Sequence, residues 1–208
     1  MQPDKNSTTK WKNTKANYTT KPRKDIVPNN KGASIFEAPF FNDLMERPKI
    51  KIKLTTADVV IELIGFIGLI LMIGLPLYFF DQLPETIPRH YGANGEPDGF
   101  SGKGIIWTLP AIGLVLYLGM YWLNKYPHSY NYPQKVTEEN AERLYSVATK
   151  MIRTLNAIIT CMFAYITFAT IQTALGNQSG LGKLFLPISL LLTFGVLGYF
   201  TIKSTNKQ

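Results

Sequence analysis

The sequence predicts an all-α protein, a four-span transmembrane helical bundle with a disordered or extended basic N-terminal tail. Its 208 residues include 22 Lys and Arg and 14 Asp and Glu, yet four windows contain none of these residue types. The windows hold 18, 21, 29 and 19 residues and cover 63–80, 104–124, 154–182 and 184–202. Helices of such length cross a hydrocarbon core of about 30 Å. A soluble helical domain would carry charge along every helix, so the pattern excludes a soluble fold.

The N-terminal part carries most of the net charge. Of the formal charge of +8, residues 1–57 contribute +7, with 12 Lys and Arg against 5 Asp and Glu. Residues 1–33 are too poor in apolar side chains to form a core, which predicts a disordered basic tail. Because membrane spans follow, we expect this tail to meet anionic lipid and no nucleic acid.

Residues 34–54 are predicted to be an interfacial or partner-docking segment. An apolar cluster opens the segment, and lysines alternate with apolar residues at its end, where they would face lipid phosphate. The predicted partner- or lipid-binding residues are Ile35, Phe36, Phe40, Phe41, Leu44, Met45, Lys49, Lys51 and Lys53.

The transmembrane domain is predicted over residues 55–203, with spans at about 58–80, 105–124, 151–175 and 184–202. Thr55 and Asp58 have the spacing of a capping box, which predicts where the first helix begins. Glu62 lies about 10 Å along that helix, and it is either functional or reaches back to the interface. Thr137 is predicted to cap the third helix, which would extend from the cytoplasm into the membrane.

The distribution of basic residues predicts the orientation. Ten Lys and Arg flank the spans on the side of the two termini, and three lie on the other side. The positive-inside rule therefore predicts cytoplasmic termini. Residues 81–104 then form an extracytoplasmic loop, whose prolines and glycines predict a compact succession of turns seated on the membrane by its apolar side chains.

This loop also holds the candidate site residues. Asn94, Glu96 and Asp98 match the first ligand positions of a calcium loop, but Ile105 occupies the position of the essential glutamate. His90 alone offers poor zinc ligation, and Ser101 has no catalytic partners beyond it. We therefore predict no metal, no cofactor and no catalytic residue. The loop is predicted to be a ligand or recognition motif made of Leu83, Pro84, Ile87, Pro88, His90, Tyr91, Gly95, Asp98 and Lys103.

The loop pattern Leu-Pro-x-x-Ile-Pro-x-His-Tyr, followed by Gly-x-x-Asp-Gly and a lysine, resembles an uncharacterised bacterial membrane domain, DUF1648. That domain is also found at the N-terminal end of the SdpI family, immunity and signalling proteins against a secreted peptide toxin. The resemblance covers residues 48–203 and implies a small polytopic protein of the bacterial inner membrane. Tyr91 stands where phenylalanine is common, and toxin-immunity members typically carry more than four spans.

Three functional classes fit these observations. The first is a non-enzymatic accessory or structural subunit of a larger membrane assembly, anchored by its N-terminal segment to other membrane subunits. The second is an SdpI-like immunity or sensor protein that binds an extracellular peptide through the loop. The third is a small transporter or metal-dependent membrane enzyme. The first is favoured because a cytoplasmic tail with the densest apolar cluster outside the spans cannot meet an extracellular toxin.

Overall fold

The computed structural model describes residues 47–206 of this protein. Within this range, four helices are long and apolar enough to cross a membrane. They are α2 (Thr56–Phe79), α3 (Thr108–Leu123), α4 (Ala141–Ala174) and α5 (Phe185–Thr205), with the short 3-10 segments η1 (Phe80–Gln82), η2 (Lys103–Trp107) and η3 (Pro127–Ser129). The predicted multi-span helical fold is confirmed. The predicted tail, residues 1–33, and residues 34–46 of the docking segment lie outside the described part.

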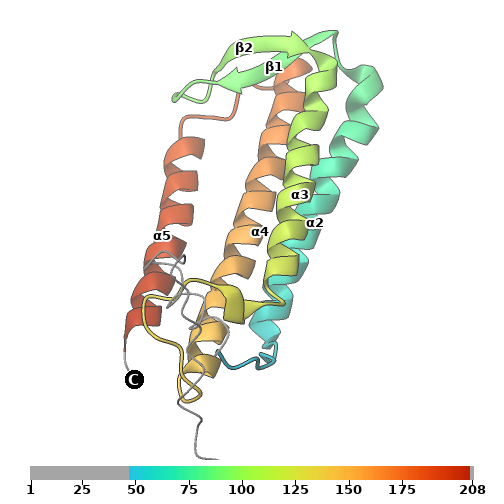
Figure 1. The fold of residues 1–208 in the computed structure, drawn as a ribbon. Helices are drawn as coiled ribbons and strands as arrows, with labels where there is room; N and C mark the ends of the chain where they lie inside the picture. Colours follow the sequence, from blue (N-terminus) through green and yellow to red (C-terminus); the bar gives the residue numbers. More distant parts are fainter. Residues whose placement is uncertain (1–46, 207–208) are drawn as a thin grey trace, which may run out of the picture. The chain divides into compact units, whose positions relative to one another are not determined.

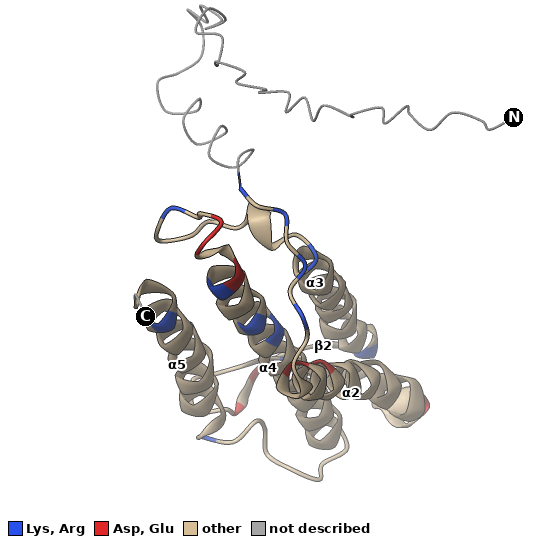
Figure 2. Cartoon of the chain, turned by 90° about the horizontal axis from the view of Figure 1, so that it is seen from below, with Lys and Arg blue, Asp and Glu red and all other residues tan. Residues whose placement is uncertain are grey.

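Helix α4 is the centre of the bundle. It contacts α2, α3 and α5 along its length, and α5 lies on the side of α4 away from α3 (Figure 1; Figure 2). Strands β1 (Thr86–Tyr91) and β2 (Pro97–Gly102) form a hairpin at one end of the helices. We call this end the hairpin end, and the opposite end, which holds residues 47–55, the loop after α3 and the end of α5, the terminal end.

Three apolar clusters lie along α4. The hairpin-end cluster contains Leu83, Ile87, Ile106 and Ile171. A middle cluster joins Leu69 and Met72 of α2 to Ala164 of α4, and a terminal-end cluster contains Val136, Ala141, Leu144 and Tyr145. Each cluster joins α4 to a different neighbour, so the core is divided along the bundle axis.

Large apolar side chains also cover the outside of the bundle. On α5, Ser189 and Phe200 are its only buried residues, and leucines such as Leu191 are largely exposed. A soluble protein rarely exposes contiguous apolar surface of this extent, whereas a bilayer covers it. The exposed faces therefore agree with the four spans that the charge-free windows predict.

The first helix begins as the sequence predicts. The Thr55 hydroxyl accepts a hydrogen bond from the Asp58 amide, and the Asp58 carboxylate accepts one from the Thr55 amide at 2.8 Å. The predicted start of the third helix is wrong. Asn140 rather than Thr137 precedes α4, because the Asn140 side chain accepts a hydrogen bond from the Thr137 amide and holds residues 137–140 in a turn.

Helices α2 and α4 approach each other closely at two glycines. A Cβ atom added at Gly65 would lie 3.3 Å from the Ala157 backbone, and one at Gly68 would lie 3.2 Å from the Cys161 sulfur. Small residues at a helix interface allow this approach within a membrane. The spacing is three residues, so the usual GxxxG pattern does not reveal it.

Candidate functional site at the hairpin end

The motif loop forms an antiparallel hairpin instead of the expected succession of turns. Ile87 lies opposite Ser101, Pro88 opposite Phe100 and His90 opposite Gly99. The register shifts between Pro88 and His90, so Arg89 is the extra residue of a bulge. Proline has no amide to donate, and a bulge next to it is a position that a β-ladder tolerates.

Two apolar residues of the motif attach the hairpin to the bundle. Leu83 and Ile87 are buried and pack with Ile106 and Ile171 in the hairpin-end cluster. Burying one side chain of this size stabilises the folded protein by about 1.5–3 kcal/mol. The expectation that these residues seat the loop on the membrane surface is therefore wrong, because they face the helices.

Gly95 attaches the tip of the hairpin to the loop between α4 and α5. The Leu181 amide donates a 2.7 Å hydrogen bond to the Gly95 carbonyl. Gly95 has a φ of +79°, and a Cβ there would lie 2.5 Å from the carbonyl oxygen of Gly182. Gly180 makes the same close approach from the other side, since its Cβ would overlap the Gly95 carbonyl. Only glycines permit this backbone contact.

Tyr91 connects the hairpin to α4. Its hydroxyl donates a 3.0 Å hydrogen bond to the Thr170 hydroxyl. Burial raises the pKa of Tyr91, while its hydrogen bond to Thr170 acts in the opposite direction. Tyr91 therefore stays neutral at physiological pH, and its role here is structural.

His90 and Asp98 form a pair on the outer surface of the hairpin. The His90 Nδ1 atom lies 2.5 Å from the Asp98 carboxylate, and the two side chains are 72% and 53% exposed. The strands hold both residues in place, yet neither is part of an apolar cluster. The contact at Nδ1 orients the imidazole ring and leaves the other nitrogen, Nε2, outside the pair. Proteins commonly orient a histidine for binding in this way.

The remaining motif residues lie elsewhere on the hairpin and at its base. Lys103 forms a 3.0 Å ion pair with Glu85 and lies 5.4 Å from the centre of the Phe80 ring. Pro84 is exposed, whereas Pro88 is buried. Phe100, next to the pair in β2, is 56% exposed. The structure therefore brings the nine motif residues into one unit but divides them into a buried set and an exposed set.

Within residues 47–206, no three His, Cys, Asp or Glu side chains lie close enough together to hold a metal ion. Asn94 donates a 2.8 Å hydrogen bond to Glu96, and it also accepts one from the Glu96 amide. These hydrogen bonds stabilise the turn between the two strands. They explain why Asn94 and Glu96, which resemble the first ligands of a calcium loop, occupy these positions.

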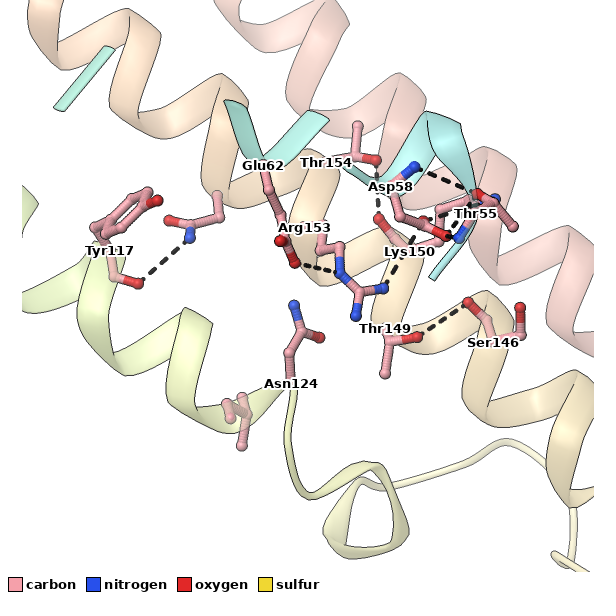
Figure 3. Close-up of polar contacts among 12 residues, drawn as sticks. Thr55, Asp58, Glu62, Tyr117, Asn124, Ser146, Thr149, Lys150, Arg153 and Thr154 are labelled. Carbon is pink, nitrogen blue, oxygen red and sulfur yellow. Dashed lines mark hydrogen bonds and ion pairs between the residues drawn. The ribbon is translucent and has the colours of Figure 1, made fainter. Parts of the chain in front are cut away.

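A second polar cluster lies at the terminal end, between α2 and α4 (Figure 3). Arg153 donates a 2.7 Å hydrogen bond to Glu62 and lies 3.7 Å from the Asp58 carboxylate, which is also 3.7 Å from Lys150. Two acids thus face two bases, and the charges balance. Glu62 does not simply reach back to the interface but joins the two helices, a contact that reasoning from the sequence missed.

The described chain begins next to the loop that follows α3. The Arg47 guanidinium donates hydrogen bonds to the carbonyls of Tyr130 and His128, and it lies 5.7 Å from the centre of the Tyr132 ring. From the predicted docking segment, Lys49, Lys51 and Lys53 are described, and all are exposed. The six apolar residues of that segment, Ile35, Phe36, Phe40, Phe41, Leu44 and Met45, lie outside the described residues.

One segment of the chain matches a known family. This segment consists of the second half of α2, the hairpin and the start of α3. Residues 67–114 match the DUF1648 family, described as a domain of unknown function. The resemblance predicted from the motif is confirmed for this family, over a shorter range than residues 48–203. An uncharacterized protein of Archaeoglobus fulgidus is 27% identical over 129 residues, which covers 55% of this chain and 70% of that protein. No solved structure matches the chain.

Proposed function

We propose that this DUF1648 protein is a non-enzymatic, multi-pass membrane protein that recognises a polypeptide through the outer face of its hairpin. The exposed His90–Asp98 pair supports this proposal most directly. The fold uses Leu83, Ile87 and Gly95 for attachment, whereas the pair contributes no buried contact. Exposed polar groups on a rigid support are typical of binding sites.

The pair offers chemistry that suits a peptide. His90 presents a ring nitrogen, Asp98 a carboxylate and Phe100 an exposed aromatic ring, all on one short hairpin. Aromatic residues flanked by oriented polar groups commonly dominate binding interfaces. This is the SdpI-like alternative among the classes that the sequence left open. We propose the bacterial inner membrane as its location, with cytoplasmic termini and the hairpin outside.

The test places a photoreactive amino acid at Phe100 in living cells. We expect a cross-linked polypeptide that disappears in the double variant His90→Ala and Asp98→Ala, with protein levels unchanged because an exposed pair contributes at most about 1 kcal/mol to stability. Thr86→Ala, an exposed change in the same hairpin, should leave the cross-link intact. A cross-link of equal yield in the double variant would contradict the proposal.

The accessory-subunit role is a second candidate, supported by the position of Arg47. Its contacts with Tyr130 and His128 fix the start of the described chain at the terminal end of the bundle. A partner bound there would not compete with one at the hairpin. Deleting residues 1–46 should release the protein from a complex purified in mild detergent. If the shortened chain still co-elutes with the same subunits, the segment is not the anchor.

A further inference from the structure

An apolar groove runs along the spanning part of the bundle between α2 and α5, with α4 as its floor. Its volume is about 710 Å³. The groove exists because α5 packs on α4, while α2 contacts α4 on another face. The walls include Ile61 and Ile64 of α2, Ala157 and Cys161 of α4, and Ile188 and Leu192 of α5.

Three of the polar side chains that line the groove contact backbone carbonyls of the protein. The Tyr165 hydroxyl donates a 2.9 Å hydrogen bond to the Leu181 carbonyl, and the Thr154 hydroxyl donates a 2.8 Å bond to the Lys150 carbonyl. The Cys161 thiol contacts the Ile64 carbonyl at 3.9 Å. With these groups satisfied, the groove offers carbon atoms to its occupant, which favours a hydrocarbon chain over a polar ligand.

The length of the groove matches one leaflet of a bilayer. On α4 it extends from Thr154 to Tyr165, and eleven residues of helix rise about 16 Å. A hydrocarbon core of about 30 Å gives each leaflet about 15 Å. An acyl chain of this length would therefore fit along the whole groove.

A single cation stands among the groove-lining residues, at the hairpin-side mouth. Lys183 lies there, exposed, two residues before the start of α5. Its loop is held by the hydrogen bond between the Leu181 amide and the Gly95 carbonyl. A lysine at headgroup level attracts anionic lipid, so charge and apolar surface here suit the two parts of one phospholipid.

We propose that this groove binds an acyl chain of an anionic phospholipid, with its phosphate at the Lys183 ammonium group. A transmembrane helix of a second copy fits less well. A helix 10 Å wide and 16 Å long occupies about 1,300 Å³, nearly twice the volume of the groove, and it would cover Lys183 without a negative partner.

The test uses the full-length chain in nanodiscs of phosphatidylcholine that contain phosphatidylglycerol with a photoactivatable acyl chain. We expect adducts on the groove-facing residues of α4 and α5, at residues 154–165 and 184–192. Lys183→Ala should lower the yield about five-fold, the preference that one near-surface lysine gives for anionic lipid. Lys203→Ala, at the other end of α5, is the matched control and should not change the yield.

A second pair of variants separates loss of the site from loss of the fold. Ile188→Trp should fill the groove and abolish the adducts, whereas Ile188→Ala enlarges the groove and should keep them. Ile112→Trp on the exposed face of α3 controls for a new tryptophan. Adducts spread evenly over α3 and α5, or equal yields for the two lysine variants, would overturn the proposal. So would a dimer by native mass spectrometry that Ile188→Trp converts to monomer.

Discussion

Glu62 and Arg153 each stand one residue before a charge-free window, and the structure joins them by a 2.7 Å hydrogen bond from Arg153 Nε to Glu62 Oε1 (Figure 3). The two windows belong to α2 and α4, which run in the same direction through the bundle (Figure 1). Residues at the same place in two such spans lie at the same depth. The pair connects the two helices at this depth. It also offsets the free-energy cost that each charge would have alone in the bilayer.

Replacing Arg153 with methionine should destabilise the protein strongly. The change removes the 2.7 Å partner of Glu62 and one of the two bases next to Asp58. Breaking a buried pair costs about 3–5 kcal/mol. We expect a loss of about 3 kcal/mol, at the lower end because the Glu62 side chain is 32% exposed. Chemical unfolding in mixed micelles measures the loss.

The matched control is a triple variant with Arg153→Met, Asp58→Asn and Glu62→Gln. Removing these three charges should recover most of the lost stability, since neutral groups of similar shape can replace a buried ion pair at little cost. If the triple variant is as unstable as the single one, packing by Arg153 rather than its charge holds the helices together.

Leucine at Gly68 should separate α2 from α4. Its Cβ would already lie 3.2–3.3 Å from Cys161 and Thr160, and the rest of the side chain adds further bulk to this tight contact. Overpacking of this kind costs about 1–3 kcal/mol. Gly74→Leu in the same helix is the control, because a Cβ there has no atom within 4 Å. Thermal unfolding in detergent should show a lowered midpoint for the first variant alone, and equal midpoints would exclude a close α2–α4 contact at Gly68.

Alanine at Gly95 should detach the hairpin tip from the loop between α4 and α5. The left-handed backbone at φ +79° costs a side-chain-bearing residue about 1–2 kcal/mol, and the contact with Gly182 adds to this. We expect the unfolding midpoint to fall by about 5 °C. Gly104→Ala should leave it unchanged, since nothing lies within 4 Å of that position. Hydrogen exchange at the Leu181 amide should also accelerate in the Gly95 variant, and an unchanged rate would argue against the contact.

Tyr130 should contribute to loss of stability at alkaline pH. Burial raises its pKa from 10.0 to about 12, with Arg153 acting weakly in the opposite direction. Between pH 10 and about 12 the unfolded chain loses this proton while the folded chain keeps it. The free energy of unfolding therefore falls as the pH rises through this window.

The variant Tyr130→Phe should show a shallower fall over that window. At neutral pH it should lose about 1 kcal/mol, because the hydroxyl donates to the Leu123 carbonyl at 2.9 Å. Tyr126→Phe, whose ring is 41% exposed, serves as the control. Unfolding measured from pH 8 to 12 in both variants decides the point, and parallel curves for Tyr130→Phe and the unmodified protein would contradict it.

The number and place of the spans follow from the sequence alone. A bilayer excludes charge over a fixed thickness, so the four charge-free windows and the Thr55–Asp58 capping box were sufficient to predict α2, α3 and α5 to within a few residues. The loop motif likewise predicted the DUF1648 match, because its prolines and glycines are separated by fixed, local spacings.

The tertiary structure alone decided which motif residues are buried and which are free to bind. Leu83 and Ile87 turn inward because Ile171 of α4 lies at their level. A glycine is needed at position 95 because the Gly180–Gly182 loop, more than eighty residues away in the chain, contacts its backbone. Contacts between distant segments depend on helix packing, which composition and spacing do not encode. His90 and Asp98 are left paired at the surface for the same reason: the packing that buries their neighbours does not reach them.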